Sequence, residues 1–275
     1  MVRRVKQKYV RSALNTGQVS LLELVYKYRF VSRQLAAESL GVKPENGLYE
    51  KLEILVKGGH LGRRFDKRLK LQGVPAAYYL TPKGLRALQA LDGHDYITEA
   101  TIKSSYRDKV VSQAFVNHTL DVYRYTNVLK QQHQELKVYL RRDITRYHYF
   151  PDNPPDAFLS LKLGDTPLRF FLDVIPDTLP RNLLDRRIAD YAEFFEDGGW
   201  EKTNSELPKL LFITEKGTTE NRTRRTIRAA LSRADMDDEL EAYTTTFTAL
   251  QDAAAAGTIW ASADYPDDRL SLPDL

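Results

Sequence analysis

The stretch FLDVIPDT, residues 171–178, decides how the C-terminal part of this sequence folds. Its apolar run predicts a buried β-strand that carries one acid, Asp173, and stops at Pro176. Burying a carboxylate is costly unless a cation or hydrogen-bond donors compensate it. Asp173 therefore needs a partner, either a metal ion or a basic side chain.

A second acid precedes the neighbouring predicted strand. Asp156 stands before the apolar segment AFLSLKL, so both carboxylates are expected at one edge of a sheet. Two converging carboxylates can hold a divalent cation that activates water and binds phosphate. This is the layout of PD-(D/E)xK nucleases, with Asp156 as the first acid and Asp173 as the second. Both are candidate catalytic residues and metal ligands, for Mg²⁺ or Mn²⁺ if the site is active.

The lysine that these nucleases place two residues after the second acid is missing, because Ile175 stands there. Lys162 on the preceding strand and Arg187 on the following helix are the basic residues that could reach across. Arg187 is the third candidate catalytic residue, although an arginine stays protonated and cannot act as a base. The alternative is structural: Asp156 caps a turn and Asp173 pairs with a nearby basic residue.

Charge separates the two ends of the chain. Residues 1–90 hold 18 Lys and Arg against 6 Asp and Glu, whereas the remainder holds 23 against 31. A basic N-terminal third indicates a polyanionic partner. The chain has no cysteine, no apolar segment long enough to span a membrane and no signal peptide, so we expect a cytoplasmic protein without membrane contact.

The order of elements in residues 17–91 predicts a winged helix-turn-helix. Helical patterns appear near residues 20–30, 32–41 and 43–58, with Ser32 as an N-cap and Gly41 as a C-terminal stop. Two short strands joined by a basic hairpin follow, and Thr81-Pro82 opens another helix.

In a helix-turn-helix the second helix of the motif enters the major groove of DNA, and basic residues of a wing contact phosphates. The exposed face of the helix and the wing supply the candidate DNA-binding residues: Lys43, Asn46, Tyr49, Lys51, Arg63, Arg64, Lys67, Arg68 and Lys70. Winged helices also act as protein-interaction modules, and this alternative remains open.

The fold class predicted is α/β, with an N-terminal winged helix-turn-helix followed by an α/β sandwich resembling the restriction-endonuclease-like fold. We expect residues 1–91 to form the first domain with a basic arm, 92–108 a linker, 109–262 the nuclease-like domain and 263–275 an acidic tail. A lone histidine, His118, lies on the long helix expected near residues 109–134 and is interpreted as a packing residue.

The segments YYLTPKGLRAL, NHTLDVYRYTNVL, PPDAFLSL, FFLDVIPDT and RRIADYAEFFEDGGW, in that order, resemble the replication-relaxation family. The resemblance implies a winged helix joined to a nuclease-like domain that acts in replication and DNA relaxation on plasmids, conjugative elements and phages. By position, His118 matches a frequent family histidine, Asp156 the acid of its Pro-Asp pair, and Arg187 a common lysine. Asp173 falls where the family usually has glutamate, and Ile175 replaces its second acid.

The resemblance implies double-stranded DNA as the partner, together with replication or relaxosome proteins, and a dimer is compatible with it. The first hypothesis is a sequence- or structure-selective DNA-binding protein whose nuclease-like domain is degenerate and has no catalytic activity or cofactor. The alternatives are a metal-dependent endonuclease or nickase using Asp156 and Asp173, and a winged-helix transcription regulator.

Overall fold

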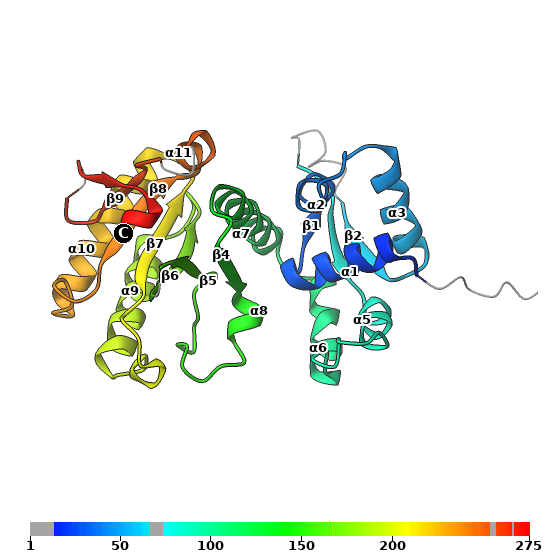
Figure 1. The fold of residues 1–275 in the computed structure, drawn as a ribbon, viewed down its shortest axis with the longest axis horizontal. Coiled ribbons are helices and arrows are strands. Elements are labelled where there is room, and N and C mark those ends of the chain that lie inside the picture. The colour runs from blue at the N-terminus through cyan, green and yellow to red at the C-terminus, as the bar shows by residue number, and fades with distance from the viewer. Residues whose placement is uncertain (1–13, 66–73, 165, 254–256, 266) are drawn as a thin grey trace, which may run out of the picture. The chain divides into compact units, whose positions relative to one another are not determined.

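The protein consists of two compact units, Met1–Ser112 and Gln113–Leu275, in a computed structural model (Figure 1). The structure describes residues 14–65, 74–164, 166–253, 257–265 and 267–275. Among these residues, no helix combines the length and apolarity needed to cross a membrane.

The first unit has the order of elements predicted for a winged helix-turn-helix, with one additional short strand, β1 (Val31–Ser32), that the sequence did not predict. A three-stranded antiparallel sheet of order β1-β3-β2 packs with the helices around Leu21, Leu22, Leu52 and Leu55. Its elements are α1 (Thr16–Tyr28), β1 (Val31–Ser32), α2 (Arg33–Leu40), α3 (Asn46–Lys57), β2 (Leu61–Arg64), β3 (Ala77–Leu80) and α5 (Pro82–Gln89).

Local capping interactions fix where these helices begin and end. The Ser32 hydroxyl accepts a hydrogen bond from the amide of Leu35 at 3.2 Å, and Gly41 ends α2 in the left-handed conformation with φ of 62°. The Thr81 hydroxyl accepts from the amide of Gly84 at 3.1 Å and donates to the carbonyl of Gly59 at 2.7 Å. Both N-caps were predicted from the sequence.

Residues 92–108, expected as a linker, instead belong to the first unit. They form α6 (Glu99–Ser104) and most of the 3₁₀ helix η1 (Ser105–Lys109). Ile102 is buried, and the carboxylate of Asp108 forms an ion pair of 2.8 Å with Arg29 of α1. These contacts place the boundary between the units after Ser112. The expected long helix accordingly starts later, as α7 (Gln113–Gln132).

The second unit is an α/β sandwich built on a seven-stranded mixed sheet of order β10-β9-β8-β7-β6-β5-β4, in which β6, β7 and β8 are parallel. Besides α7, its elements are β4 (Leu136–Leu140), α8 (Arg141–Ile144), β5 (Ala157–Leu163), β6 (Thr166–Ile175), α9 (Arg181–Glu196), η2 (Glu201–Thr203), β7 (Lys209–Thr214), α10 (Gly217–Arg233), β8 (Ala242–Thr246), α11 (Phe247–Asp252), β9 (Trp260–Ser262), β10 (Arg269–Leu270) and η3 (Leu272–Asp274). The predicted α/β fold class is therefore confirmed.

Strand β6 contains the stretch that carries Asp173, and it lies inside this sheet between β7 and β5 (Figure 1). Alternate residues of a strand point to opposite faces. Phe171 and Ile175 join the apolar cluster formed with α9 and α10, which includes Ile188, Tyr191 and Ile227. Asp173 lies between them on the same face of the strand, so its side chain points toward α9.

The acidic tail expected for residues 263–275 is part of the fold. Strand β10 pairs antiparallel with β9 at the end of the large sheet. Leu272 and Leu275 are buried, with 1% and 6% of their surface exposed. The sequence-based interpretation was wrong because it relied on the acidic side chains of the segment and gave no weight to these two leucines.

Gly84 of α5 provides a test of the first unit's packing. A methyl group at this position would lie 2.2 Å from the carbonyl oxygen of His60, whereas one at Gly47 of α3 meets no atom within 4 Å. We expect Gly84→Ala to reduce the free energy of unfolding by about 2 kcal/mol. Gly47→Ala, with helix propensity in its favour, should raise it by up to about 1 kcal/mol. Urea unfolding followed by circular dichroism measures both, and equal stabilities for the two variants would contradict the packing described.

Candidate functional site

Asp173 of β6 accepts hydrogen bonds on both of its carboxylate oxygens. Oδ1 accepts from the Nη2 of Arg187 at 2.7 Å and from the backbone amide of Asp156 at 3.1 Å. Oδ2 accepts from the Nε of Arg187 at 3.0 Å and from the hydroxyl of Tyr191 at 2.8 Å. The Asp173 side chain is only 5% exposed, so its charge is compensated almost entirely within the protein.

Arg187 is held as firmly as the carboxylate it binds. Its Nη1 donates to the carbonyl of Asn153 at 2.9 Å, and its Nη2 also donates to the carbonyl of Pro154 at 2.8 Å. The guanidinium lies 4.9 Å from the centre of the Tyr191 ring. The planar fork of arginine fits a carboxylate with two parallel hydrogen bonds, an arrangement both stronger and more specific than a single contact.

Asp156 is tied to the same network from the start of β5. Its Oδ1 lies 3.0 Å from the Nε2 of His118 on α7, and its Oδ2 accepts from the amide of Val174 at 3.0 Å. The structure thus brings Asp156, Asp173 and Arg187 together, as the sequence predicted. The packing role given to His118 is only part of its role, because the imidazole also partners a carboxylate.

The electrostatics follow from these contacts. Burial by itself lowers the pKa of His118, but the hydrogen bond and charge of Asp156 outweigh it and raise that pKa overall. Burial opposes ionisation of Asp156, yet His118 and Arg187 bring its pKa below the usual value. Burial and the charge of Asp173 together raise the pKa of the Tyr191 hydroxyl, which therefore stays a donor. Arg187 and Asp173 form an ion pair, and the pair of His118 with Asp156 favours a protonated imidazole beside an ionised carboxylate.

The other two positions discussed from the sequence, Ile175 and Lys162, add no charge to the network of Asp156 and Asp173. Ile175, two residues after Asp173, is 3% exposed and packs in the apolar cluster beneath α9. A charged residue there would enter that core. Lys162 pairs with Pro167 in the strand register, whereas Ala157 pairs with Leu172, so Lys162 lies about 16 Å along β5 from the Asp156 end.

This arrangement does not fit a divalent cation shared by both carboxylates. A cation would have to displace the guanidinium of Arg187 from Asp173 and the imidazole of His118 from Asp156. Among the described residues, no three His, Asp or Glu side chains are grouped as metal ligands.

Two supporting residues were not identified from the sequence as parts of this network. Tyr191 stands one helical turn after Arg187, and that i, i+4 spacing could have indicated that both reach the same acid. Arg141 of α8 donates to the carbonyl of Pro154 at 2.9 Å, which orders the loop before β5. No local pattern signals the second contact, because it depends on how the loop folds back.

The candidate DNA-binding residues form a second, separate surface on the first unit. Helix α3 buries Leu48, Leu52 and Leu55, and the described candidates Lys43, Asn46, Tyr49 and Lys51 are all exposed. The guanidinium of Arg33 lies 5.8 Å from the centre of the Tyr49 ring. Arg33 was not among the residues predicted from the sequence.

The two described wing arginines make contacts within the protein. Arg63 of β2 forms an ion pair with Glu53 of α3, and Arg64 donates to the carbonyl of Val111. The remaining wing candidates, Lys67, Arg68 and Lys70, and the basic arm lie outside the described residues. A hollow of about 490 Å³ borders α3 and the sheet, lined by Arg33, Tyr49, Arg63, Phe65, Val74, Pro75, Ala76 and Tyr78.

Comparison with known families gives one match. The family model described as replication-relaxation matches residues 22–210, which covers most of both units. The resemblance inferred from the sequence motifs is therefore confirmed. No curated protein matches this chain.

Comparison with solved structures finds similarity to structures of restriction endonuclease FokI. The structure titled FokI bound to DNA matches 86% of this chain and 43% of that chain, with a TM-score of 0.29 and 14% identity. A second structure titled restriction endonuclease FokI covers the same shares, with a TM-score of 0.32 and 12% identity. The present chain thus spans less than half the length of these proteins.

The pairing of Arg187 with Asp173 predicts a large effect of removing the arginine. Arg187→Met leaves a buried carboxylate without its cation, which typically costs about 3–5 kcal/mol of unfolding free energy. Arg186→Met is the matched control, since Arg186 is the exposed neighbour on α9 and should change stability by about 0.5 kcal/mol or less. Urea unfolding of both variants measures the difference.

A second variant separates loss of charge pairing from loss of packing. Asp173→Asn combined with Arg187→Met removes the uncompensated charge and should recover part of the lost stability. Equal stability of the single and double variants would contradict the role of the ion pair.

The His118–Asp156 pair predicts a pH dependence. Because the pKa of His118 is raised in the folded state, its contribution is complete below the unfolded value of about 6.5 and is lost as pH rises through the folded value. His118→Asn should therefore cost more unfolding free energy at pH 5.5 than at pH 8.5. His133→Asn should show the opposite trend, because burial lowers the pKa of His133. Urea titrations at both pH values measure how the loss of unfolding free energy changes with pH for each variant.

Proposed function

Because the chain belongs to the replication-relaxation family, we propose that it is a double-stranded DNA-binding protein of a plasmid, conjugative element or phage. It acts in DNA replication or relaxation by binding rather than by cleavage. The first unit contacts the duplex, and the second unit is a nuclease-like domain whose catalytic edge has become structural.

The observation that carries this proposal is that Arg187 binds the Asp173 carboxylate. Its two oxygens accept from the guanidinium of Arg187, at 2.7 and 3.0 Å, at the place where a nuclease of this layout would bind its metal ion. A guanidinium supplies a fixed positive charge but no vacant position for water or phosphate oxygen. It therefore satisfies the carboxylate without supplying the chemistry of a metal ion.

The position two residues after Asp173, where the replication-relaxation family has its second acid, supports the same conclusion. Ile175 stands there and packs among the apolar residues of α9 and α10. An acid at this position would be buried without a cation, so the core has closed over a position that a nuclease needs to keep polar.

DNA binding is supported by charge and exposure in the first unit. Residues 1–90 carry 18 basic against 6 acidic residues, an excess suited to phosphate contacts. Lys43, just before α3, and Asn46, Tyr49 and Lys51 on it are exposed, and α3 is the element that a winged helix inserts into the major groove. Arg63 and Arg64 contribute less, because both already have partners within the protein.

A combined binding and nicking experiment tests the proposal. The full chain should shift a labelled duplex in a salt-dependent manner and leave supercoiled plasmid intact in Mg²⁺ or Mn²⁺. Replacing Lys43 and Lys51 by Gln should reduce the magnitude of the slope of log affinity against log salt by about 2. The matched control replaces Lys162 and Lys202, exposed lysines of the second unit, and should bind like the wild type.

Two outcomes would overturn the proposal. Failure of the wild-type chain to bind duplex DNA at low salt removes the binding function. Nicking that requires a metal ion and disappears in Asp173→Asn establishes the endonuclease instead.

A further inference from the structure

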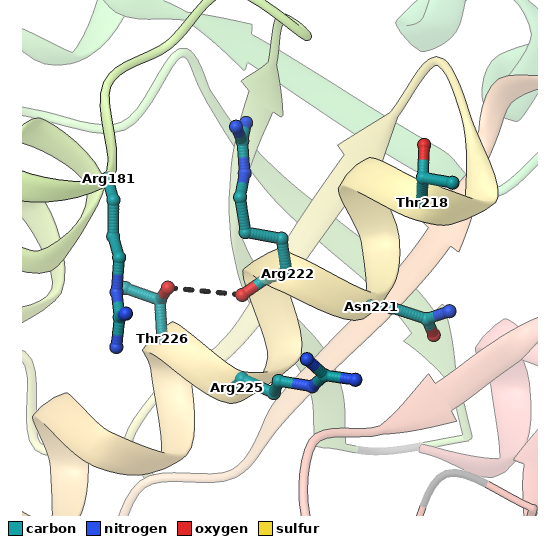
Figure 2. Close-up of a pocket in the computed structure, with 6 residues that line it drawn as sticks. All are labelled: Arg181, Thr218, Asn221, Arg222, Arg225 and Thr226. Carbon is teal, nitrogen blue, oxygen red and sulfur yellow. Dashed lines mark hydrogen bonds between the residues drawn. The ribbon is translucent and has the colours of Figure 1, made fainter.

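A polar hollow lies on the second unit, where α10 meets the start of α9 (Figure 2). Its volume is about 340 Å³. It is lined by Arg181, Thr218, Asn221, Arg222, Arg225 and Thr226. Every lining side chain is polar, and three of them are arginines. The hollow is therefore suited to an anion.

Helical geometry places these side chains together. Thr218, Arg222 and Arg225 follow one another at intervals of four and three residues along α10, so they share one face of the helix. The apolar residue Ile227 points into the core instead. Arg181 is the first residue of α9, which packs against α10, and Figure 2 shows it as the one lining residue that comes from outside α10.

The described arginines of the second unit divide into those that form an ion pair with a carboxylate and those that do not. Arg124, Arg187, Arg233 and Arg269 each form an ion pair with a carboxylate. Within the described part of the chain, Arg181, Arg222 and Arg225 have no carboxylate within ion-pair distance. The carboxylate of Asp177 interacts with Arg222 at longer range, but no described carboxylate forms a direct ion pair with any of the three. Three arginines that line one hollow without a direct ion pair are available to an anionic ligand.

The Nε of Arg222 gives an independent indication. This atom is buried and has no hydrogen-bond partner among the described residues. The side chain makes one long contact, from Nη2 to the carbonyl of Asp177 at 3.4 Å. Buried polar groups almost always have partners in native proteins, so an unsatisfied donor at the wall of a basic hollow points to a ligand.

We propose that this hollow binds a phosphate of the DNA backbone, a contact that rests on the DNA-binding function proposed above. Arginine forks together with hydroxyl and amide groups are the common partners of backbone phosphates. The lining contains no aromatic or aliphatic side chain to contact a nucleobase, which favours a backbone phosphate over a nucleotide. The nuclease-like unit thereby adds an attachment point for DNA on a part of the chain that is acidic overall.

Duplex binding by the full chain, measured over a salt series, tests this contact. The variant carries Arg181→Gln, Arg222→Gln and Arg225→Gln. Losing one phosphate contact should reduce the magnitude of the slope of log affinity against log salt by about 1. The affinity should fall by about tenfold at the salt concentration where the wild type is half bound. A control with Lys137→Gln, Lys162→Gln and Lys202→Gln has the same change in net charge at exposed positions and should bind like the wild type.

The single variant Arg225→Gln keeps the test valid if the triple variant is unstable, because Arg225 is exposed and forms no ion pair in the described structure. It should weaken binding in the same direction and leave the urea midpoint unchanged.

Each remaining outcome is informative. Duplex binding equal in the wild type, the triple variant and Arg225→Gln would overturn this inference while leaving the proposed function intact. Equal losses in the triple variant and the lysine control would also overturn it, because they would reflect net charge alone. Inorganic phosphate that binds the wild type but not the triple variant, with duplex binding unchanged, would make the hollow a site for free phosphate. A wild type that binds no duplex refutes the proposed function itself.

Discussion

The buried pair of Arg187 and Asp173 is the interaction on which the second unit depends. A carboxylate buried in an interior strand of a sheet is tolerated only if its charge is compensated. Here one guanidinium binds both oxygens while two backbone carbonyls hold the guanidinium. The pair connects β6, α9 and the loop before β5. Removing either member leaves the other charge buried, so the two residues have to be retained together.

The rest of the polar network is arranged around this pair. The amide of Asp156 donates to Asp173, and the Asp156 carboxylate accepts from the amide of Val174 and faces His118. Asp156 thus joins β5 to β6 in the same way that a capping residue closes a turn, and His118 adds α7. Two acids meet at one edge of the sheet, and their carboxylates hold protein elements together. This is the physical basis of the degenerate nuclease-like domain proposed above.

Sequence patterns predicted the elements that local chemistry specifies, and missed those that depend on distant partners. The Ser32 and Thr81 caps, the strand carrying Asp173 and the reach of Arg187 follow from short-range rules. Residues 92–108 were expected as a linker because their sequence shows no helical periodicity. Their attachment to the first unit depends on the ion pair of Asp108 with Arg29, which is far away in sequence. The unpaired arginines of α10 were equally hidden, since a sequence does not show which cations lack a carboxylate.

An arginine at an acidic edge has different physical consequences from a metal ion. A metal site must stay open to water and substrate, which prevents the surrounding edge from closing into a core. A guanidinium needs no exchange, so Ile175 can pack where a charged residue would otherwise stand, and the edge gains apolar burial. In the function proposed above, the second unit binds DNA without cutting it. The phosphate contact proposed for the hollow beside α10 and the ion-paired acidic edge both suit that function, because a domain that only binds DNA uses phosphate contacts and needs no nucleophile.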